Sequence, residues 1–210
     1  MKKLGLVLIV IVGLIVVLGI SVAGSYNGLV GKKPGVDAAW AQILNQYQRR
    51  ADLVPNLVKT VQGSANFEKS TLEAVVNARA SVGKVTIDPT KMLEDPGSFQ
   101  KFQEAQGQFS GALQRLLVVS ENYPDLKASA GFRDLQAQLE GTENRIAVER
   151  GRFNDVVKDF NTAVSRFPTV IFAGMLGFHP KPYFQSDAGT DKAPEVNFDF
   201  GGSAAPANGK

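Results

Sequence analysis

Hydrophobic residues fill the chain from Leu4 to Ala23 without a single charge, directly after Lys2 and Lys3. A helix of about 20 apolar residues spans about 30 Å, the thickness of the hydrocarbon core of a bilayer. A cleaved signal peptide is the alternative, but its apolar stretch is only about 7–15 residues long. The longer run predicts a membrane anchor over residues 1–25, with the lipid bilayer as the partner of residues Leu4 to Ala23.

Basic residues flank the apolar run on both sides and decide its orientation by a small margin. Lys2, Lys3 and the α-amine precede the run, whereas Lys32 and Lys33 follow it. Cytoplasmic flanks carry the excess of Lys and Arg, and the N-terminal flank here is very short. We therefore predict a single-pass protein of the cell (inner) membrane with an extracytoplasmic soluble domain, and the inverted orientation is the alternative.

Beyond the anchor, apolar residues recur at spacings of three, four or seven, which keeps them on one face of a helix. The first such segment extends from Val36 to Val82. Pro55 predicts a kink in the preceding turn, because proline removes one backbone hydrogen bond, and Gly63-Ser64 is a second weak point. The pattern leaves open whether this segment is one kinked helix or two.

Two further apolar stripes follow a connection between Gly83 and Ser98 that is interrupted by Asp-Pro steps. One stripe extends from Phe99 to Leu116, and the other begins at Ser129, a residue suited to an N-cap. Long helices joined by short turns bury their stripes by packing side by side. The pattern thus predicts an all-α fold, in which an N-terminal transmembrane helix leads into an elongated bundle of long antiparallel helices.

The bundle domain is expected over residues 26–184. After it the composition shifts to Gly, Ala, Pro, Asp and Asn, which predicts a disordered tail over residues 185–210. The aromatic residues of the domain lie at helical spacing, so we expect them to pack in the core and not to form a cofactor site. These residues are Phe99, Phe102, Phe109, Phe132, Phe153 and Phe160.

Six polar residues fall on or beside the apolar stripes, where an unpaired charge or amide would be costly to bury. They are Arg50, Glu68, Glu143, Arg150, Asn154 and Asn161. One interpretation is a polar network that fixes the register between helices, a role that buried polar groups have in bundles. The other interpretation is a catalytic or ligand-binding site around Arg50 and Glu143.

A short apolar segment follows Pro168 and is too short to span a bilayer. Its hydrophobic side chains require a cover. The preferred interpretation is that the segment folds back over one end of the bundle, and the alternative is a docking patch for a membrane surface or another protein. The candidate patch consists of Ile171, Phe172, Met175, Leu176 and Phe178.

The residue types that most catalytic sites need are missing from the sequence. The chain has no Cys and a single His, His179. This excludes disulfides, thiolate metal sites and a di-metal centre that needs Glu-x-x-His elements on two helices. A single His also makes a Ser-His-Asp triad a poor candidate, and no glycine-rich phosphate loop occurs in the sequence. The net charge of +3 is spread along the chain without a dense basic block. We therefore predict no enzyme activity, catalytic residue, metal or cofactor, and no nucleic-acid partner.

Several motifs occur in a fixed order between residues 1 and about 184. They are Tyr26-Asn27-Gly28-Leu29-Val30, Arg49-Arg50-Ala51-Asp52-Leu53-Val54-Pro55-Asn56-Leu57-Val58, Glu121-Asn122-Tyr123-Pro124-Asp125-Leu126-Lys127, Gly141-Thr142-Glu143-Asn144-Arg145-Ile146, and the pairs Phe153-Asn154 and Phe160-Asn161. In these motifs the chain resembles the LemA family of bacterial membrane-anchored proteins. The resemblance implies a helical bundle of the four-helix type behind an N-terminal transmembrane segment, and it implies no particular reaction.

The function favoured by the sequence is a non-enzymatic, membrane-anchored helical scaffold or adaptor in the bacterial cell envelope. Its partners would be envelope or membrane proteins or a second copy of the chain. The alternatives are a small-ligand binder or enzyme that uses the polar row around Arg50 and Glu143, and a membrane-surface remodeller that uses the segment after Pro168. A pocket converging on Arg50 and Glu143 would favour the binder, whereas a paired and dry arrangement would favour the scaffold.

Overall fold

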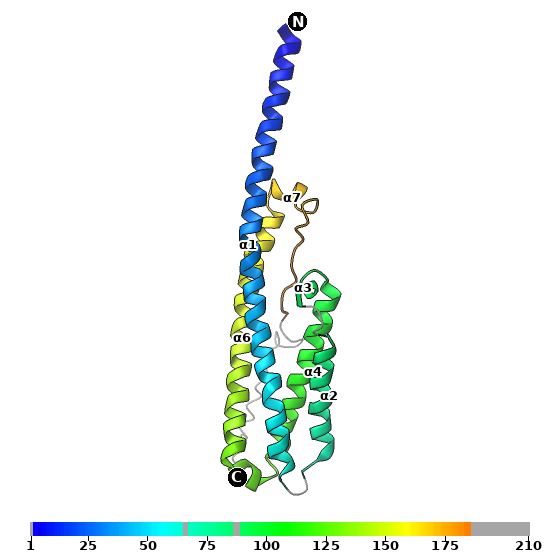
Figure 1. The fold of residues 1–210 in the computed structure, drawn as a ribbon, viewed down its shortest axis with the longest axis vertical. Coiled ribbons are helices and arrows are strands. Elements are labelled where there is room, and N and C mark those ends of the chain that lie inside the picture. The colour runs from blue at the N-terminus through cyan, green and yellow to red at the C-terminus, as the bar shows by residue number, and fades with distance from the viewer. Residues whose placement is uncertain (1, 65–66, 86–88, 186–210) are drawn as a thin grey trace, which may run out of the picture.

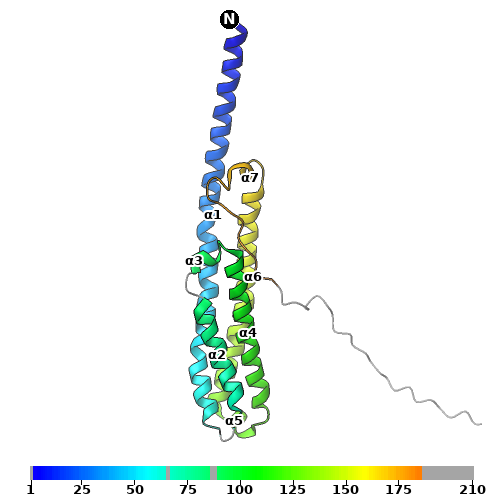
Figure 2. The same cartoon turned by 90° about the vertical axis from the view of Figure 1, so that its right-hand side faces the viewer.

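The computed structural model of the chain describes residues 2–64, 67–85 and 89–185. Within these ranges the chain forms helices and no strand, which confirms the predicted all-α fold. Four long helices lie side by side in an elongated bundle, and the N-terminal part of the first projects far beyond it (Figure 1, Figure 2). Of the tail expected over residues 185–210, all but the first residue lies outside the described residues.

Successive long helices run in opposite directions along the bundle (Figure 1). The long helices are α1 (Lys2–Gln62), α2 (Lys69–Val85), α4 (Pro96–Ser120) and α6 (Ala130–Ser165). The short helices are α3 (Pro89–Met92), α5 (Pro124–Ala128) and α7 (Thr169–Phe172). The bundle part of α1 packs along α6, and α2 packs along α4. The short helix α7 lies at the end from which α1 projects, and α5 lies at the opposite end (Figure 2).

The helix α1 has 61 residues and two different surroundings. The large hydrophobic side chains from Leu6 to Ile20 are exposed, whereas Leu29 and Val36 are buried against the bundle. Within the described residues, α1 is the one helix that is long and apolar enough to cross a membrane. The predicted N-terminal apolar helix is therefore present, and it continues without interruption into the bundle.

The sequence predicts a kink before Pro55, but α1 continues through this residue. Proline has no N–H, so the carbonyl of Ala51, four residues earlier, loses its helical donor. Arg79 of α2 donates its Nε–H to this carbonyl oxygen at 2.9 Å and replaces the missing donor. Val54 and Leu57, on either side of the proline, are both buried in the bundle. Packing and a donor from a neighbouring helix thus hold α1 together at this point.

The segment from Val36 to Val82 belongs to two helices, which answers the question that the sequence left open. The helix α1 ends at Gln62, and the chain turns at Gly63 and Ser64, the second weak point of the sequence. The helix α2 then begins at Lys69. Glycine and serine have a lower helix propensity than alanine, and α1 ends directly before them.

Side-chain caps fix the first turns of α4 and α6. The N-cap predicted at Ser129 is confirmed, since its Oγ accepts a hydrogen bond from the N–H of Phe132 at 3.3 Å. The carboxylate of Asp95 caps α4 and accepts from the N–H groups of Gly97 and Ser98, both at 3.1 Å. The Ser98 hydroxyl and these two N–H groups hold the pKa of Asp95 below its usual value. Both helices therefore begin at positions set by local hydrogen bonds.

The buried apolar side chains form two core segments along the bundle axis. The proximal core, on the anchor side, surrounds Trp40, whose ring centroid lies 5.4 Å from that of Phe102 and 5.6 Å from that of Phe153. The distal core groups residues such as Leu57 and Phe132. The prediction that the stripe aromatics pack in the core is confirmed for Phe99, Phe102, Phe109, Phe132, Phe153 and Phe160.

Candidate functional site

A fully buried arginine lies between the two core segments. Nη1 of Arg50 donates to Ser110 Oγ and to Glu143 Oε1, each at 2.6 Å. Nη2 donates to the side-chain oxygen of Gln106. The residues Arg50, Gln106, Ser110 and Glu143, here called the Arg50 layer, thus connect α1 with α4 and α6. The structure brings together Arg50 and Glu143, the two residues around which the sequence placed a possible site.

The Arg50 layer occupies one level of the bundle because each helix interrupts its apolar stripe there. The interrupted stripes are Tyr47-Arg50-Val54, Phe102-Gln106-Phe109 and Leu139-Glu143-Ile146. The polar member lies three or four residues from its apolar neighbours, which places it on the same inward face. A shift of one helix along another would separate these groups and leave a buried guanidinium without acceptors. The layer is therefore suited to fixing the register of the helices.

The two charges of the layer have different access to water. The side chain of Arg50 is 0% exposed, whereas that of Glu143 is 40% exposed. Aromatic rings cover the guanidinium, whose central carbon lies 4.8 Å from the ring centroid of Phe109 and 5.2 Å from that of Tyr47. Nε of Arg50 is buried and has no hydrogen-bond partner among the described residues. The arginine end of the pair is therefore dry, and the glutamate end faces solvent.

A second arginine extends the polar contacts toward the proximal core. Nε of Arg150 donates to the hydroxyl of Tyr47 at 2.8 Å, and its guanidinium lies over the rings of Tyr47 and Phe184 at 5.7 and 5.1 Å. Burial raises the pKa of Tyr47, although the charge of Arg150 acts in the opposite direction. The phenol therefore stays protonated at neutral pH, between Arg150 on one side and Arg50 on the other.

A shallow groove of about 330 Å³ lies between α4 and α6 beside the solvent-facing end of the pair. Its lining residues are Ser110, Leu113, Gln114, Leu117, Leu139, Glu140, Glu143 and Asn144. Arg50 is not one of them, because its guanidinium is covered from this side by Ser110 and Glu143, the residues it bonds. A ligand in this groove would meet two carboxylates and amides, but not the buried cation.

Asn154 and Asn161 have partners other than the Arg50 layer. The amide of Asn154 donates to the carbonyl of Phe184 at 2.9 Å and accepts from its N–H at 2.9 Å. The amide of Asn161 makes the same pair of bonds with Lys181, at 2.8 and 2.7 Å. Asn154 and Asn161 are seven residues apart, which is about 10.5 Å along a helix. Their partners Lys181 and Phe184 are three residues apart, which is about 10 Å in an extended segment, so the asparagines and their partners have the same spacing. These side chains hold the extended segment 179–185, here called the strap, against α6.

Glu68, which the sequence grouped with the polar row, lies away from the Arg50 layer. It is exposed and immediately precedes α2. Its carboxylate accepts from the hydroxyls of Ser70 at 2.7 Å and Thr71 at 3.1 Å, and these bonds hold its pKa below the usual value. The turn at Gly63-Ser64 ends α1 before this position, so Glu68 is not on the stripe on which the sequence pattern placed it.

The sequence interpretation missed several partners of the two arginines. Gln106 stands at a stripe position between Phe102 and Phe109, and this interruption was a signal that could have identified it. Ser110 gave no such signal, because a serine beside a stripe is common on helix surfaces. Tyr47 lies on the apolar stripe of α1, and its position predicts burial but not the partner of its hydroxyl. The strap could not be inferred either, since a single sequence does not show that the side chains of Asn154 and Asn161 bond its backbone.

The apolar segment after Pro168 is partly folded back and partly exposed. Phe172 is 8% exposed, and Leu176 and Phe178 are half-buried. By contrast, Ile171 is 65% exposed and Met175 is 81% exposed. The five residues of the candidate patch therefore divide into those that pack against the bundle end and those that face outward.

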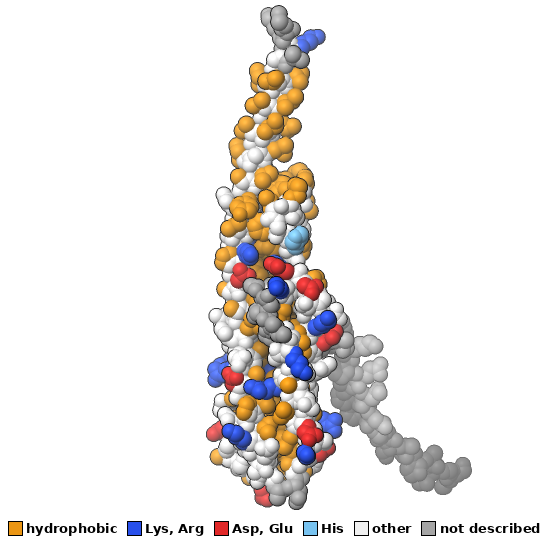
Figure 3. Space-filling model, turned by 45° about the vertical axis from the view of Figure 1, so that its right-hand side comes forward, with side chains coloured by type: hydrophobic (Ala, Val, Ile, Leu, Met, Phe, Trp, Pro, Cys, Tyr) orange, Lys and Arg blue, Asp and Glu red, His pale blue; other side chains and the backbone are white. Residues whose placement is uncertain are grey.

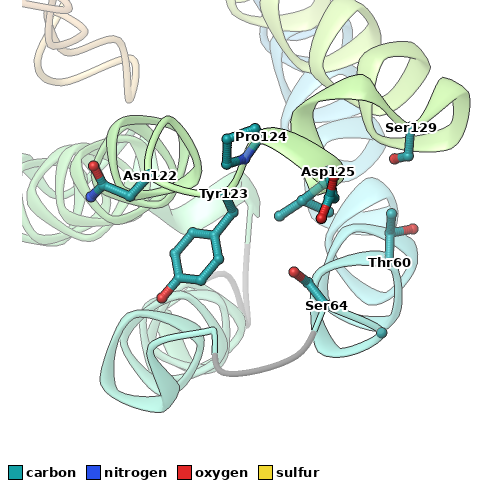
Figure 4. A pocket seen from close by; sticks show the side chains of 9 residues that line it. Thr60, Ser64, Asn122, Tyr123, Pro124, Asp125 and Ser129 are labelled. Carbon is teal, nitrogen blue, oxygen red and sulfur yellow. The ribbon is translucent and has the colours of Figure 1, made fainter.

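A second hollow, of about 560 Å³, lies at the far end of the bundle, where α1 ends and α4 turns into α5 (Figure 4). Thr60 and Ser64 line it from the end of α1, Asn122 and Tyr123 line it from the turn, and Asp125 lines it from α5. The lining offers hydroxyls and one carboxylate without a histidine to act as base. No group of three or more His, Cys, Asp or Glu that could hold a metal ion occurs in the part of the chain that the structure describes.

Comparison with known proteins finds relatives named MamQ and LemA. The magnetosome protein MamQ of Magnetospirillum gryphiswaldense is 28% identical over 181 residues, and magnetosome protein MamQ 1 of Paramagnetospirillum magneticum is 26% identical over the same length. Each match covers 79% of this chain, and the chain spans 66% of the length of either relative. Protein LemA of Metamycoplasma hominis is 23% identical over 163 residues, covering 78% of this chain and 70% of that protein.

A family model also matches most of the chain. Residues 39–198, which include α1 from residue 39 onward and all later helices, match the LemA family. The match contains the Arg50 layer and both asparagines that hold the strap. With the apolar first part of α1, these similarities indicate a membrane-associated protein. The chain belongs to the LemA family.

Proposed function

We propose that the protein is a membrane-anchored, non-enzymatic scaffold or adaptor of the bacterial cell envelope, which presents its helical bundle to envelope or membrane proteins. The observation that carries the proposal is the continuity of α1, because its apolar part and its bundle part form one helix, Lys2–Gln62. A continuous helix transmits the direction of the anchor to the bundle, which a flexible linker would not do. The bundle is thereby held upright at a defined height above the membrane.

The Arg50 layer supports a structural role for the charged residues of the bundle. The partners of Arg50 are side chains of the bundle itself, and rings cover its guanidinium. A buried cation that is already paired is not available to a substrate. We therefore assign the layer to holding the helices in register and expect the bundle to be inert toward hydrolase and transferase substrates.

We further propose that the anchor is a single pass in the inner membrane with the bundle outside the cytoplasm. The support is the pair of basic residues Lys2 and Lys3 directly before the apolar run. A reporter that is active only outside the cytoplasm, fused after Lys210, should be active in cells. Activity of a cytoplasm-only reporter at the same position would show that the orientation is inverted.

The scaffold proposal is tested by crosslinking in living cells. A photo-reactive residue at Val118 of α4 or Val148 of α6, whose side chains are 69% and 53% exposed, should form adducts with defined envelope proteins. A bundle released by deleting residues 1–23 and exported to the same compartment should lose these adducts, because the anchor supplies the local concentration. If the released bundle formed the same adducts at the same yield, anchoring would not be part of the function.

A small-ligand binder remains the second candidate, and one observation favours it. Glu143 is 40% exposed in the groove between α4 and α6 and lies beside Glu140. A cationic or polar ligand in this groove should raise the unfolding temperature of the protein, and Glu140→Gln should reduce that rise without disturbing Arg50. A screen in which no compound shifts the unfolding temperature would leave the scaffold as the function.

A further inference from the structure

A patch of exposed hydrophobic side chains lies at the anchor end of the bundle. Its members, here called the α7 patch, are Phe167 (76% exposed), Val170 (53%), Ile171 (65%) and Met175 (81%). No charged residue occurs between positions 167 and 178. Soluble surfaces usually scatter such side chains singly, so a contiguous group of this kind marks contact with another apolar body.

The backbone around α7 is fixed, which keeps the patch facing outward. Phe172 and Ala173 are 8% and 2% exposed, and Ala173 belongs to the proximal core. The segment ends in a turn at Gly177, where φ is +80°, and the N–H of Phe178 donates to the carbonyl of Ala173 at 2.9 Å. This arrangement is a Schellman motif, and its positive φ suits glycine. The exposed side chains cannot turn inward without removing the buried pair from the core.

The position of α7 along α1 places the patch at the depth where the anchor leaves the membrane. The ring of Phe178 lies 5.8 Å from the ring of Tyr26, measured between centroids. Tyr26 comes three residues after Ala23, the last residue of the apolar run, which is about 4.5 Å along a helix. Tyrosine is enriched at the membrane–water interface of membrane proteins. Figure 3 shows the hydrophobic side chains around α7 directly beside those of the apolar part of α1.

Basic residues flank the apolar segment in sequence and lie near its C-terminal end in space. Arg166 precedes the apolar segment and is exposed, and Lys181 follows it. Lys33 of α1 and Lys181 line the same small hollow, together with Glu94 and His179. Lysine and arginine at such positions reach the phosphates of lipid headgroups while apolar neighbours enter the acyl region. An apolar patch bordered by cations at this depth fits a lipid surface better than it fits a second protein.

We propose that the α7 patch inserts into the interface of the leaflet from which α1 emerges and forms a second membrane contact. The proposal rests on the proposed function, because it requires α1 to cross the bilayer. Two contacts at different points of the molecule fix its tilt, whereas a single helix can tilt freely within the bilayer. The patch would therefore hold the bundle in one attitude relative to the membrane.

The absence of cysteine from the sequence allows a direct test with single-cysteine variants of the full chain. Ile171→Cys and Met175→Cys carry an environment-sensitive fluorophore in vesicles of phosphatidylethanolamine and phosphatidylglycerol that contain doxyl-labelled lipid. Leu14→Cys reports on the anchor, and Val118→Cys is the matched control, because Val118 is 69% exposed at the opposite end of the bundle. We expect quenching at Ile171 and Met175 by lipid labelled near the headgroup, several-fold stronger than at Val118. The Leu14 probe should be quenched by lipid labelled deep in the acyl chain.

The outcomes separate this inference from the proposed function. If the Leu14 probe is quenched while the probes at Ile171 and Met175 match Val118, the patch does not enter the membrane, and the anchor stands. If the Leu14 probe is not quenched either, the anchor itself fails. If the Ile171 and Met175 probes are shielded only at high protein-to-lipid ratio, a second copy covers the patch, and the lipid proposal is wrong.

Discussion

At the scale of single residues, the Arg50 layer shows how a buried charge can be tolerated in a helical bundle. Moving a guanidinium out of water is costly, and three partners on α4 and α6 offset that cost with hydrogen bonds. Glu143 stays 40% exposed, so its own desolvation is incomplete. The asymmetry has a consequence for mutants, because the arginine depends on the glutamate more than the glutamate depends on the arginine.

We expect Glu143→Leu to destabilise the protein by about 3–5 kcal/mol, because it leaves the Arg50 cation buried without its counter-charge. Adding Arg50→Met should recover a large part of this loss, since the double variant no longer buries a charge. The measurement is a double-mutant cycle from urea unfolding in detergent, followed by circular dichroism. Glu140→Leu, an exposed change on the same helix, is the control and should alter stability by less than about 0.5 kcal/mol. Additive effects of the two core changes would show that the residues do not interact.

The hydrogen bond from Arg79 to Ala51 gives a second prediction at this scale. Arg79→Met should cost about 0.5–1.5 kcal/mol, because the carbonyl freed by Pro55 loses its donor. In a Pro55→Ala background, the new N–H of residue 55 satisfies the same carbonyl, and Arg79→Met should then cost much less. Unfolding free energies of the four proteins measure this coupling. Lys84→Met on α2 serves as the control, and equal costs of Arg79→Met in both backgrounds would refute the explanation.

At the scale of elements, the strap and α6 fit each other by matching lengths. Asn154 and Asn161 are one heptad apart, and their backbone partners Phe184 and Lys181 are three residues apart in the opposite direction. Each asparagine side chain donates one hydrogen bond to the strap backbone and accepts one from it, which is the pattern that a neighbouring β-strand would make. The strap in turn places Phe184 over Phe99 and Phe153, at centroid distances of 4.9 and 5.5 Å.

We expect Asn154→Leu to release the strap at its proximal-core contact while leaving the helix intact. The N–H and carbonyl of Phe184 lose their partners, at a cost of about 1–3 kcal/mol if they stay buried. Hydrogen exchange followed by mass spectrometry should therefore show faster exchange in residues 179–185. Asn144→Leu, which changes an exposed asparagine of the same helix, should leave strap exchange unchanged. Unchanged exchange in Asn154→Leu would mean that packing of Phe184 holds the strap by itself.

The elements themselves were largely predictable because their signals are local. Stripe spacing predicted the long helices, and Ser129 predicted the start of α6, since a cap depends on residues within one turn. The effect of Pro55 was overestimated, because the compensating donor is Arg79, on another helix. Glu68 was misplaced for a related reason, since the exact end of α1 decides whether it lies on the stripe. Ser110 depends on a tertiary contact that a single sequence does not display. Gln106 could have been identified, because it interrupts the apolar stripe between Phe102 and Phe109.

At the scale of the whole molecule, the apolar segment proposed as the anchor and the bundle share one helix, α1. The part of α1 from Ala23 to Gln62 rises roughly 60 Å at 1.5 Å per residue, so the proposed anchor would place the far end of the bundle well away from the bilayer. The helix α6 runs beside this part of α1, and α7 with the strap ties the top of α6 back to it. The assembly therefore behaves as one stiff rod rather than as a domain on a tether.

This stiffness leads to the last prediction. A Gly-Ser-Gly-Ser insertion after Gly24 should uncouple the bundle from the anchor, because glycine-serine segments behave as flexible coils. Energy transfer from a fluorophore on Val118→Cys to acceptor lipids should be weak and narrowly distributed in the parent chain, and stronger and broader after the insertion. Four alanines inserted at the same site keep the helix and should preserve the weak, narrow signal. If both insertions gave the same distribution as the parent, α1 would not be what holds the bundle upright, and its continuity would carry no argument for a scaffold.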